Sequence, residues 1–284
     1  MIEVHSRSAL QQALAQHRHA ARSIALVPTM GNLHAGHLSL VDRAAQHADV
    51  IITSVFVNPT QFAPGEDFDR YPRTLQADRM ALQNSPCSLL FTPGVEDMYP
   101  AGIDQSVTIK PAAVLAERLC GANRPGHFDG VLTVVARLLL LTGADVAVFG
   151  EKDYQQLLLI EHMCRDLGFP TRIVRAPTLR ESSGLAMSSR NQYLQPQQRQ
   201  QAAALYQTLQ QMRARIDRGA RDYAALMTAG MQQLQTAGIA VEYLQIVNAN
   251  SLQQATVGDH QLRILVAARL PGARLIDNLA VDLG

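Results

Sequence analysis

The segment from Ile24 to His37 constrains the fold of this chain more than any other part of the sequence. It begins with an apolar run that is typical of a buried strand and that stops at Pro28, and a turn of small residues follows. His34 and His37 then stand at the start of an apolar, well-patterned helix. A strand, a glycine turn and a helix N-terminus in this order leave backbone N–H groups without partners, and the helix dipole adds partial positive charge. The segment therefore predicts an anion-binding site in which two imidazoles donate hydrogen bonds.

Composition excludes several classes of function. With 284 residues the chain is long enough for two domains, and 47% hydrophobic and 17% charged residues are typical of a globular protein. The N-terminal residues lack the apolar core of a signal peptide, and the longest apolar run, 131–141, is too short to span a membrane. A formal net charge of +1 argues against nucleic-acid binding. Three cysteines without a close pair indicate reduced thiols in a cytoplasmic protein.

Apolar periodicity predicts that strands and helices alternate as far as residue 176. We expect strands at 24–28, 50–57, 88–92, 145–149 and 171–176, with a minor one at 107–109, and helices at 6–19, 38–45, 74–84, 131–141 and 154–167. This alternation predicts an α/β fold with a doubly wound, Rossmann-like parallel sheet. Neither G-x-G-x-x-G nor a P-loop motif is present, so the usual dinucleotide and P-loop sites are not expected.

The pattern changes beyond Pro196. Two helices rich in glutamine and alanine are expected, and three strand-like runs follow them, of which the last two are joined by a hairpin turn. The ranges are 197–218 and 222–237 for the helices and 241–247, 262–270 and 275–281 for the strands. This is an α+β pattern. We therefore predict a catalytic domain over residues 1–178 and a smaller α+β lid domain over 179–284.

Polar side chains follow two of the predicted strands of the first domain. Asn58 and Gln61 come after the strand at 50–57, and Lys152 comes after the strand at 145–149. Ligand clefts in open parallel sheets lie beyond the carboxyl ends of the strands, so these side chains are expected at such a cleft. Lys152 is one of only two lysines in the chain, and an ammonium there would suit a phosphate. The alternative is an ordinary surface lysine.

Two further polar stretches are of interest. Residues 120–130 contain too many helix breakers for regular structure, and they form either an ordered loop that carries Arg124 and His127 beside the cleft or a solvated turn. Residues 188–190, Ser-Ser-Arg, combine two hydroxyls, backbone N–H groups and a guanidinium group, which suits phosphate binding. They lie where the alternating pattern ends, and we interpret them as part of a lid or hinge.

Six stretches of the chain together resemble the pantoate–β-alanine ligase family, within the nucleotidyltransferase-like superfamily that shares the H-x-G-H motif. The likeness runs in order from the first predicted strand to Asn191, and the remaining residues are compatible with the smaller C-terminal domain of the family. The matching stretches are Pro28-Thr-Met-Gly-Asn-Leu-His-Ala-Gly-His37, Phe56-Val-Asn-Pro-Thr-Gln-Phe62, Tyr71-Pro-Arg-Thr74, Arg124-Pro-Gly-His-Phe128, Phe149-Gly-Glu-Lys-Asp-Tyr-Gln-Gln156 and Met187-Ser-Ser-Arg-Asn191.

The resemblance implies a two-step ligation in the pathway to pantothenate and coenzyme A. Pantoate attacks the α-phosphate of ATP to give pantoyl adenylate and pyrophosphate, and β-alanine then displaces AMP to give pantothenate. It also implies a cytoplasmic homodimer whose partners are these small molecules rather than nucleic acid or membrane, with ATP as substrate and Mg²⁺ as cofactor. Donors placed around the α-phosphate and the leaving pyrophosphate would lower the barrier of the first step.

The resemblance also assigns residues. It implies catalytic roles for His34, His37, Lys152 and Arg190, and it implies pantoate binding by Gln61 and Gln156, with Asn58 at the same rim. It further implies a contact of Gln61 with β-alanine. The residues expected to bind ATP are Met30, Gly31, Asn32, Leu33, His34, Ala35, Gly36, His37, Gly150, Glu151, Lys152, Asp153, Leu179, Met187, Ser188, Ser189 and Arg190.

The chain departs from the family pattern at Ser183, where relatives commonly carry an acidic residue, although Glu181 is near. No dedicated carboxylate cage for a metal is visible, and Asp78 is only a weak candidate, so Mg²⁺ is expected to be held mainly by the phosphates. Two rival interpretations stay open here. One is a different nucleotidyltransferase that makes a dinucleotide. The other is a zinc module of His34, His37 and His127, which lacks cysteine ligands at metal spacing.

Overall fold

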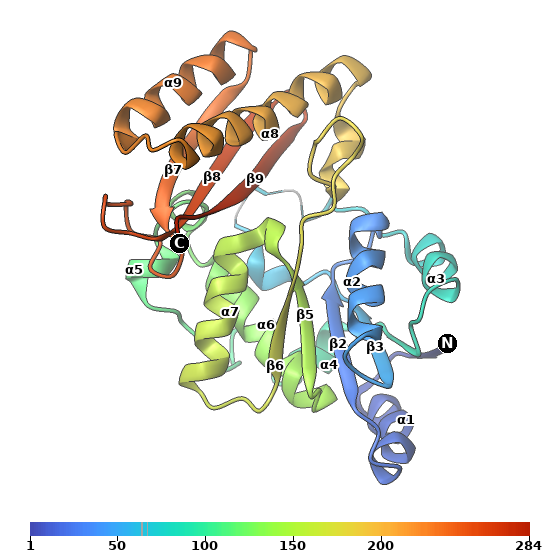
Figure 1. Ribbon diagram of the computed structural model, residues 1–284. Helices are drawn as coiled ribbons and strands as arrows, with labels where there is room; N and C mark the ends of the chain where they lie inside the picture. Colours follow the sequence, from blue (N-terminus) through green and yellow to red (C-terminus); the bar gives the residue numbers. More distant parts are fainter. Residues whose placement is uncertain (64, 67) are drawn as a thin grey trace. The chain divides into compact units, whose positions relative to one another are not determined.

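The computed structural model describes residues 1–63, 65, 66 and 68–284 and forms two compact units (Figure 1). Each unit is built from segments that are not contiguous in sequence. The first unit comprises Met1–Glu117, Gly121–Glu151 and Gln156–Pro177, and the second comprises Arg118–Cys120, Lys152–Gln155 and Thr178–Gly284. Two short internal segments, 118–120 and 152–155, therefore belong with the C-terminal part of the chain.

The first unit contains a six-stranded parallel sheet in the order β1-β4-β3-β2-β5-β6. The strands are β1 (Ile2–Val4), β2 (Ile24–Thr29), β3 (Val50–Val55), β4 (Leu89–Phe91), β5 (Val146–Gly150) and β6 (Arg172–Ala176). Strand order reverses between β2 and β5, because the chain leaves β2 toward β3 on one side and returns to β5 on the other. Open α/β sheets bind ligands beyond the carboxyl ends of strands at such a point.

Helices flank this sheet. They are α1 (Arg7–His19), α2 (Ala35–Ala45), α3 (Leu75–Gln83), α4 (Val95–Met98), α5 (Ala113–Ala116), α6 (His127–Thr142) and α7 (Tyr154–Asp166), with short 3-10 helices η1 (Pro59–Gln61), η2 (Gly121–Asn123) and η3 (Glu151–Asp153). Val41 and Ala44 of α2 share a buried core with Ala25 and Val27 of β2. Ile24 and Leu26, also buried, alternate with these residues and point to the opposite face. Both faces of β2 are therefore covered, which explains its continuous apolar run.

The second unit has a three-stranded antiparallel sheet in the order β7-β8-β9, with two long helices packed on it (Figure 1). The elements are η4 (Ser189–Tyr193), α8 (Pro196–Asp217), α9 (Tyr223–Thr236), β7 (Ala240–Asn248), β8 (Gln261–Leu270) and β9 (Ala273–Asp282). Leu205 and Leu209 of α8 and Val266 of β8 are buried in one apolar core. Gly272, with φ of +92°, turns the hairpin between β8 and β9.

The predicted fold class is confirmed, but the predicted end of β2, the predicted start of α6 and the predicted minor strand at 107–109 are wrong. Strand β2 continues through Pro28 to Thr29. Pro28 is tolerated because β5 pairs only with Ala25 and Leu26, so the side of Pro28 toward β5 lies beyond that ladder. Helix α6 begins at His127, within the stretch we expected to be irregular, after Gly126 at φ of +76°. The minor strand at 107–109 is not formed, and Ile109 N–H donates instead to Thr133 Oγ1 at 2.9 Å.

Candidate active site

The turn after β2 is shaped by one buried carboxylate. Asp78 is 2% exposed, and its oxygens accept the backbone N–H groups of Asn32 at 3.0 Å and Leu33 at 2.7 Å. Gly31 has φ of +82°, and a Cβ there would lie 3.0 Å from Asp78 Oδ2, so the turn requires glycine. Thr29 Oγ1 accepts the N–H of Gly31 at 3.2 Å. The turn is therefore held by side chains beneath it.

The two imidazoles at the start of α2 have a defined tautomer. His34 Nδ1 accepts the N–H of Gly36 at 3.1 Å, and His37 Nδ1 accepts the N–H of His34 at 3.3 Å. A nitrogen that accepts a hydrogen bond carries no proton, so each neutral ring keeps its proton on Nε2. The ring centroids are 4.0 Å apart. Two Nε2–H donors thus lie side by side at the N-terminus of a helix, where an anion is favoured.

Gln61 and Asn58 lie at the carboxyl end of β3. Gln61 Nε2 donates to the sulfur of Met30 at 2.9 Å, which brings the loop after β3 to the turn after β2. Asn58 is only 1% exposed, and its Nδ2 donates to Gln61 Oε1 at 3.2 Å and to the Gly130 carbonyl at 3.1 Å. Its Oδ1 accepts the hydroxyl of Tyr99 at 2.7 Å. Both the oxygen and the nitrogen of the Asn58 amide are therefore bonded to protein groups, and the nitrogen helps to orient the Gln61 side chain.

Arg124 and His127 lie beside Gln61. The guanidinium of Arg124 donates to His127 Nε2 at 2.9 Å and pairs with Glu66 through Nε at 2.6 Å and Nη2 at 2.7 Å. His127 Nδ1 then donates to the Gln61 carbonyl at 2.7 Å. Burial raises the pKa of Glu66, but the hydrogen bond and charge of Arg124 outweigh it, so this pKa lies below its ordinary value. The solvated-turn interpretation of this stretch is wrong.

Gly130 allows helix α6 to approach η1 closely. A Cβ at Gly130 would lie 2.3 Å from the Thr60 carbonyl oxygen, a backbone atom that cannot move aside. The same close approach lets the Gly130 carbonyl accept the Asn58 amide. The position of Gln61 therefore depends on the absence of a side chain at residue 130.

The end of β5 divides between the two units. Gly150 and Glu151 belong to the first unit, and Lys152 and Asp153 belong to the second. Lys152 lies in η3 with its side chain 19% exposed, and its Nζ is 3.7 Å from Asp153 Oδ2. Gln156 follows in the first turn of α7, is half-buried, and belongs to the first unit. Lys152 is therefore not a freely exposed surface lysine.

The remaining predicted ATP residues lie in the second unit. Met187 N–H donates to the Leu179 carbonyl at 2.9 Å, so these two predicted residues are neighbours. Ser188 caps η4, and its Oγ accepts the N–H of Arg190 at 3.2 Å. Ser189 and Arg190 are half-buried in the first turn of η4. The Ser-Ser-Arg segment is thus an ordered turn.

Glu181 supports this turn. Its carboxylate accepts Asn191 Nδ2 at 2.8 Å and both Nε and Nη2 of Arg199 at 2.8 Å. The hydrogen bonds of Arg199 and Asn191 hold the pKa of Glu181 below its ordinary value. Ser183 is exposed in the preceding hairpin, where its Oγ accepts the N–H of Leu185 at 3.4 Å. The carboxylate that binds this turn is therefore that of Glu181, through Asn191, and residue 183 supplies none.

The zinc interpretation finds no support in the described residues. Both ring nitrogens of His127 are engaged by protein partners, and so are the Nδ1 atoms of His34 and His37. In the part of the chain that the structure describes, no group of three or more histidine, cysteine, aspartate and glutamate side chains could hold a metal ion. Asp78, our weak metal candidate, faces backbone N–H groups instead.

Sequence reasoning considered Asp78 only as a weak metal candidate and gave Glu181 no role, so it missed the hydrogen bonds through which these two carboxylates hold their turns. Asp78 contacts residues 45 and 46 positions away, and no local pattern marks such a contact.

Among the described residues, no helix is both long enough and apolar enough to cross a membrane.

The described residues define an α/β protein with a doubly wound parallel sheet, in which two imidazoles stand at the start of the helix that follows β2. The model of the pantoate-beta-alanine ligase family matches residues 3–280. The chain therefore belongs to the pantoate–β-alanine ligase family.

Individual relatives agree over nearly the whole chain. A pantothenate synthetase from Pseudomonas paraeruginosa is 53% identical over 274 residues, 96% of each chain. The structure of pantothenate synthetase from Thermus thermophilus matches with a TM-score of 0.92 at 47% identity, covering 98% of this chain and 99% of that chain. The pantoate-beta-alanine ligase from Francisella tularensis, complexed with Beta-gamma ATP and β-alanine, matches with a TM-score of 0.81 at 34% identity over 98% and 97%.

Membership of this family defines the reaction. The chain is an AMP-forming carbon–nitrogen ligase of pantothenate biosynthesis, which joins pantoate and β-alanine through a pantoyl-adenylate intermediate. The dinucleotide-forming alternative is thereby excluded.

Proposed function

We propose that His34 and His37 donate their Nε2–H groups to phosphate oxygens of ATP during adenylation. The observation that carries this proposal is the acceptor role of both Nδ1 atoms, which leaves both protons on Nε2. Contrary to the expectation of open N–H groups in this turn, the following backbone N–H groups are bonded to protein acceptors: those of Gly31, Asn32, Leu33, His34 and Gly36. We therefore place the imidazoles, rather than these backbone groups, against the phosphate oxygens. Neutral donors suit this step, because negative charge on the phosphate oxygens grows as pantoate attacks.

In the first step, a carboxylate oxygen of pantoate forms a bond to the α-phosphorus, and the bond from that phosphorus to the bridging oxygen breaks. Pyrophosphate leaves with the bonding electrons. We propose that Lys152, Ser188, Ser189 and Arg190 stabilise this charge, and that Gly150, Glu151, Asp153, Leu179 and Met187 complete the ATP site. The ammonium and guanidinium groups of Lys152 and Arg190 support this assignment by their chemistry.

We propose that Gln61 and Gln156 bind pantoate, with Asn58 holding Gln61 in place. Neutral amides orient a carboxylate nucleophile without pairing it as strongly as a cation would. In the second step, the amine of β-alanine attacks the acyl carbon of the adenylate, the bond to the phosphate oxygen breaks, and AMP leaves. The amine loses a proton as the amide forms. Gln61 is also proposed to contact β-alanine.

Mg²⁺ is proposed to enter with ATP, as part of the substrate. The described residues do not form a protein cage for it, and the Asp78 carboxylate is occupied by backbone N–H groups. Mg²⁺ commonly keeps several waters and binds through substrate phosphates, which supports this proposal. No step of the reaction is assigned to a protein-bound metal.

Three further proposals concern the whole protein. Residues 179–284 are proposed to act as a lid over residues 1–178 that keeps water from the adenylate. The chain is proposed to work as a homodimer, as the family resemblance implies, and light scattering would then give twice the chain mass.

A cytoplasmic location is supported by three free, buried cysteines, and burial raises the pKa of Cys164 to about 11.

Exchange of labelled pyrophosphate into ATP tests the proposed roles. We expect exchange that requires pantoate and proceeds without β-alanine, because the first step is reversible. Lys152→Ala should reduce the exchange rate by about 100-fold or more, as loss of one transition-state donor does in other enzymes. The matched control is Lys110→Ala, because Lys110 is the other lysine and is exposed. If folded Lys152→Ala exchanged pyrophosphate at the same rate as Lys110→Ala, Lys152 would have no role in adenylation.

A further inference from the structure

Asn278 in strand β9 holds the backbone of Lys152. Asn278 is 4% exposed, and its Nδ2 donates to the Lys152 carbonyl at 2.9 Å. Its Oδ1 accepts Nε of Arg263, a β8 residue, at 2.7 Å. Because a guanidinium group only donates, the amide of Asn278 has one possible orientation. The Lys152 carbonyl is therefore bound by a side chain that cannot turn away.

The aromatic residue after η3 strengthens this attachment. The Arg263 guanidinium lies over the Tyr154 ring, 4.0 Å from its centroid, and the Tyr154 hydroxyl donates to the Ala249 carbonyl at 2.9 Å. Arg263 therefore contacts both Asn278, which binds the Lys152 carbonyl, and Tyr154, two residues after Lys152. Segment 152–155 is fixed to the sheet of the second unit at two points.

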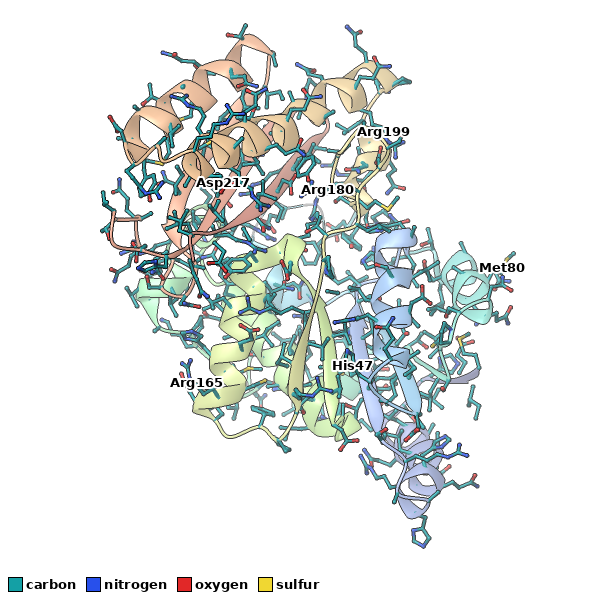
Figure 2. All side chains as sticks on the ribbon, viewed as in Figure 1. His47, Met80, Arg165, Arg180, Arg199 and Asp217 are labelled. Atoms are coloured by element: carbon teal, nitrogen blue, oxygen red, sulfur yellow. The ribbon has the colours of Figure 1, made fainter. Side chains whose placement is uncertain are left out.

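The preceding residue, Asp277, holds the other predicted phosphate segment. Asp277 is 3% exposed and accepts Arg180 Nη1 at 2.6 Å and Nη2 at 2.9 Å. Arg180, labelled in Figure 2, also donates to the Gly184 carbonyl at 3.1 Å and stacks on Tyr206 of α8 at 3.6 Å. A planar guanidinium in a bidentate pair has little rotational freedom.

Arg180 is connected to the Ser-Ser-Arg turn, residues 188–190, by backbone contacts. Arg180 forms an antiparallel bridge with Ala186, and Met187 N–H donates to the Leu179 carbonyl at 2.9 Å. The Ala186 carbonyl accepts Asn191 Nδ2 at 3.0 Å, across the turn at 188–190. The turn is therefore tied to the base of a hairpin whose first residue is held by Asp277.

Asp277 and Asn278 project to opposite faces of β9, because they are consecutive residues of a strand. In the register with β8, Asp277 pairs with Val266, which belongs to the core beneath the helices, and Asn278 pairs with Leu265, which does not. One rigid stretch of backbone thus holds Lys152 on one face and the Arg180 hairpin on the other.

We propose that Asp277 and Asn278 are positioning residues for adenylation, which set the Lys152 backbone and the Ser188–Arg190 turn at a fixed spacing. A buried ion pair such as Arg180 with Asp277 is a poor source of stability, because desolvation offsets much of the attraction. Its bidentate geometry instead serves placement. The proposal rests on the proposed phosphate roles of Lys152 and of residues 188–190.

Asn278→Asp is the test variant. It keeps the shape of the side chain and an oxygen for Arg263, but it replaces the donor to the Lys152 carbonyl with a second oxygen. We expect the rate of pantoate-dependent pyrophosphate exchange to fall by about 10- to 100-fold, as displacement by an ångström does in other enzymes. The KM for pantoate should stay unchanged. The reaction of purified pantoyl adenylate with β-alanine should also keep its rate, because pyrophosphate has already left.

Asn250→Asp is the matched control, since Asn250 is exposed in the loop between β7 and β8 and should leave both rates unchanged. Asp277→Asn is the second variant, and it should reproduce the selective loss if Asn278→Asp does not fold, as judged by its circular dichroism melt. Equal loss in both half-reactions, or no loss in a folded variant, would overturn the proposal. If Lys152→Ala lost pyrophosphate exchange while folded Asn278→Asp kept the wild-type rate, the phosphate role of Lys152 would stand. The positioning role of Asn278 would be rejected.

Discussion

At the scale of single residues, Asp78 fixes the shape of the turn between β2 and α2. It is almost fully buried, and it accepts two backbone N–H groups from Asn32 and Leu33, which lie outside the helices and strands. Thr74 Oγ1 lies 3.3 Å from each of its oxygens. Asp78 thus fixes the direction in which the backbone enters α2 and presents His34 and His37.

We predict that Asp78→Asn lowers the free energy of unfolding by about 2 kcal/mol, because one of two charge-assisted hydrogen bonds is replaced by a clash between donors. Urea denaturation followed by circular dichroism measures this. Asp166→Asn is the control, because Asp166 pairs with the neighbouring Arg165 and both side chains are more than half exposed, at 61% and 64%. A similar, small loss in both variants would contradict the role given to Asp78.

Residue identities could be predicted from the sequence where the backbone itself creates the site. His34 and His37 follow a glycine turn at a helix start, so an anion site could be inferred without a structure. Their tautomers could not, because these depend on which N–H reaches each Nδ1. Asp277 and Asn278 could not be predicted either. Their partners Arg180 and Lys152 are 97 and 126 positions away, and only the fold brings them together.

At the scale of secondary-structure elements, the contact between α6 and η1 determines where Gln61 lies. We predict that Gly130→Ala costs about 1–3 kcal/mol of stability, because a Cβ would overlap the Thr60 carbonyl. Alanine would ordinarily stabilise a helix relative to glycine by up to about 1 kcal/mol, so the sign itself is informative. Denaturant unfolding measures the change, and the KM for pantoate should rise.

Gly258→Ala provides the comparison for Gly130→Ala. A Cβ at Gly258 would meet nothing within 4 Å, so its effect should stay within about 0.5 kcal/mol. Stabilisation by Gly130→Ala would show that α6 can move away from η1 at no cost.

The turn that carries Ser188–Arg190 should respond to acid through Glu181. Its pKa is lowered from 4.5 in the folded state, so the ionised carboxylate stabilises the fold above about pH 4.5. That contribution is lost as the pH falls through the lower folded pKa. We predict that wild type melts at a higher temperature than Glu181→Gln at pH 7 and that the difference shrinks below pH 4.5. The same substitution at exposed Glu117 is the control, and a difference independent of pH would contradict the assignment.

Long elements were predictable because burial leaves a continuous apolar run in a strand covered on both faces and a helical apolar period in a helix buried on one face. Strands β3 and β5 and helices α7 and α8 are all formed close to the expected ranges. Strand β1 gave no such signal, since it has three residues and only Val4 is buried. The start of α6 was hidden because Gly126 and Gly130 are helix breakers by propensity, while close packing on η1 requires glycine at residue 130.

At the scale of the whole molecule, the second unit depends on two short segments from the middle of the chain. Gln155 Oε1 accepts the Cys120 N–H at 3.1 Å, and its Nε2 donates to the Arg118 carbonyl at 2.8 Å. Cys120 Sγ lies 3.1 Å from the Tyr243 hydroxyl, and Arg274 Nη2 donates to the same sulfur at 3.6 Å. The two segments are thus joined to each other and to the sheet.

We therefore predict that residues 178–284 expressed alone unfold at a lower temperature than the same unit in the full chain. Removal of segments 118–120 and 152–155 takes the Lys152 carbonyl from Asn278 Nδ2 and the Tyr154 ring from the Arg263 guanidinium, and a lost buried hydrogen bond costs about 1–3 kcal/mol. Calorimetry of the fragment and the full chain measures this. A fragment as stable as the intact unit would show that the two segments do not contribute.

The bond from Asn278 to Lys152 also has a consequence for protein synthesis. These residues are 126 positions apart, and β9 comes last in sequence among the strands that the structure describes. While the ribosome is still making residues before 278, Lys152 has no partner for its carbonyl from that strand. On the proposed positioning role, activation of pantoate would then begin only after residue 278 has been synthesised and β9 has joined the sheet of the second unit.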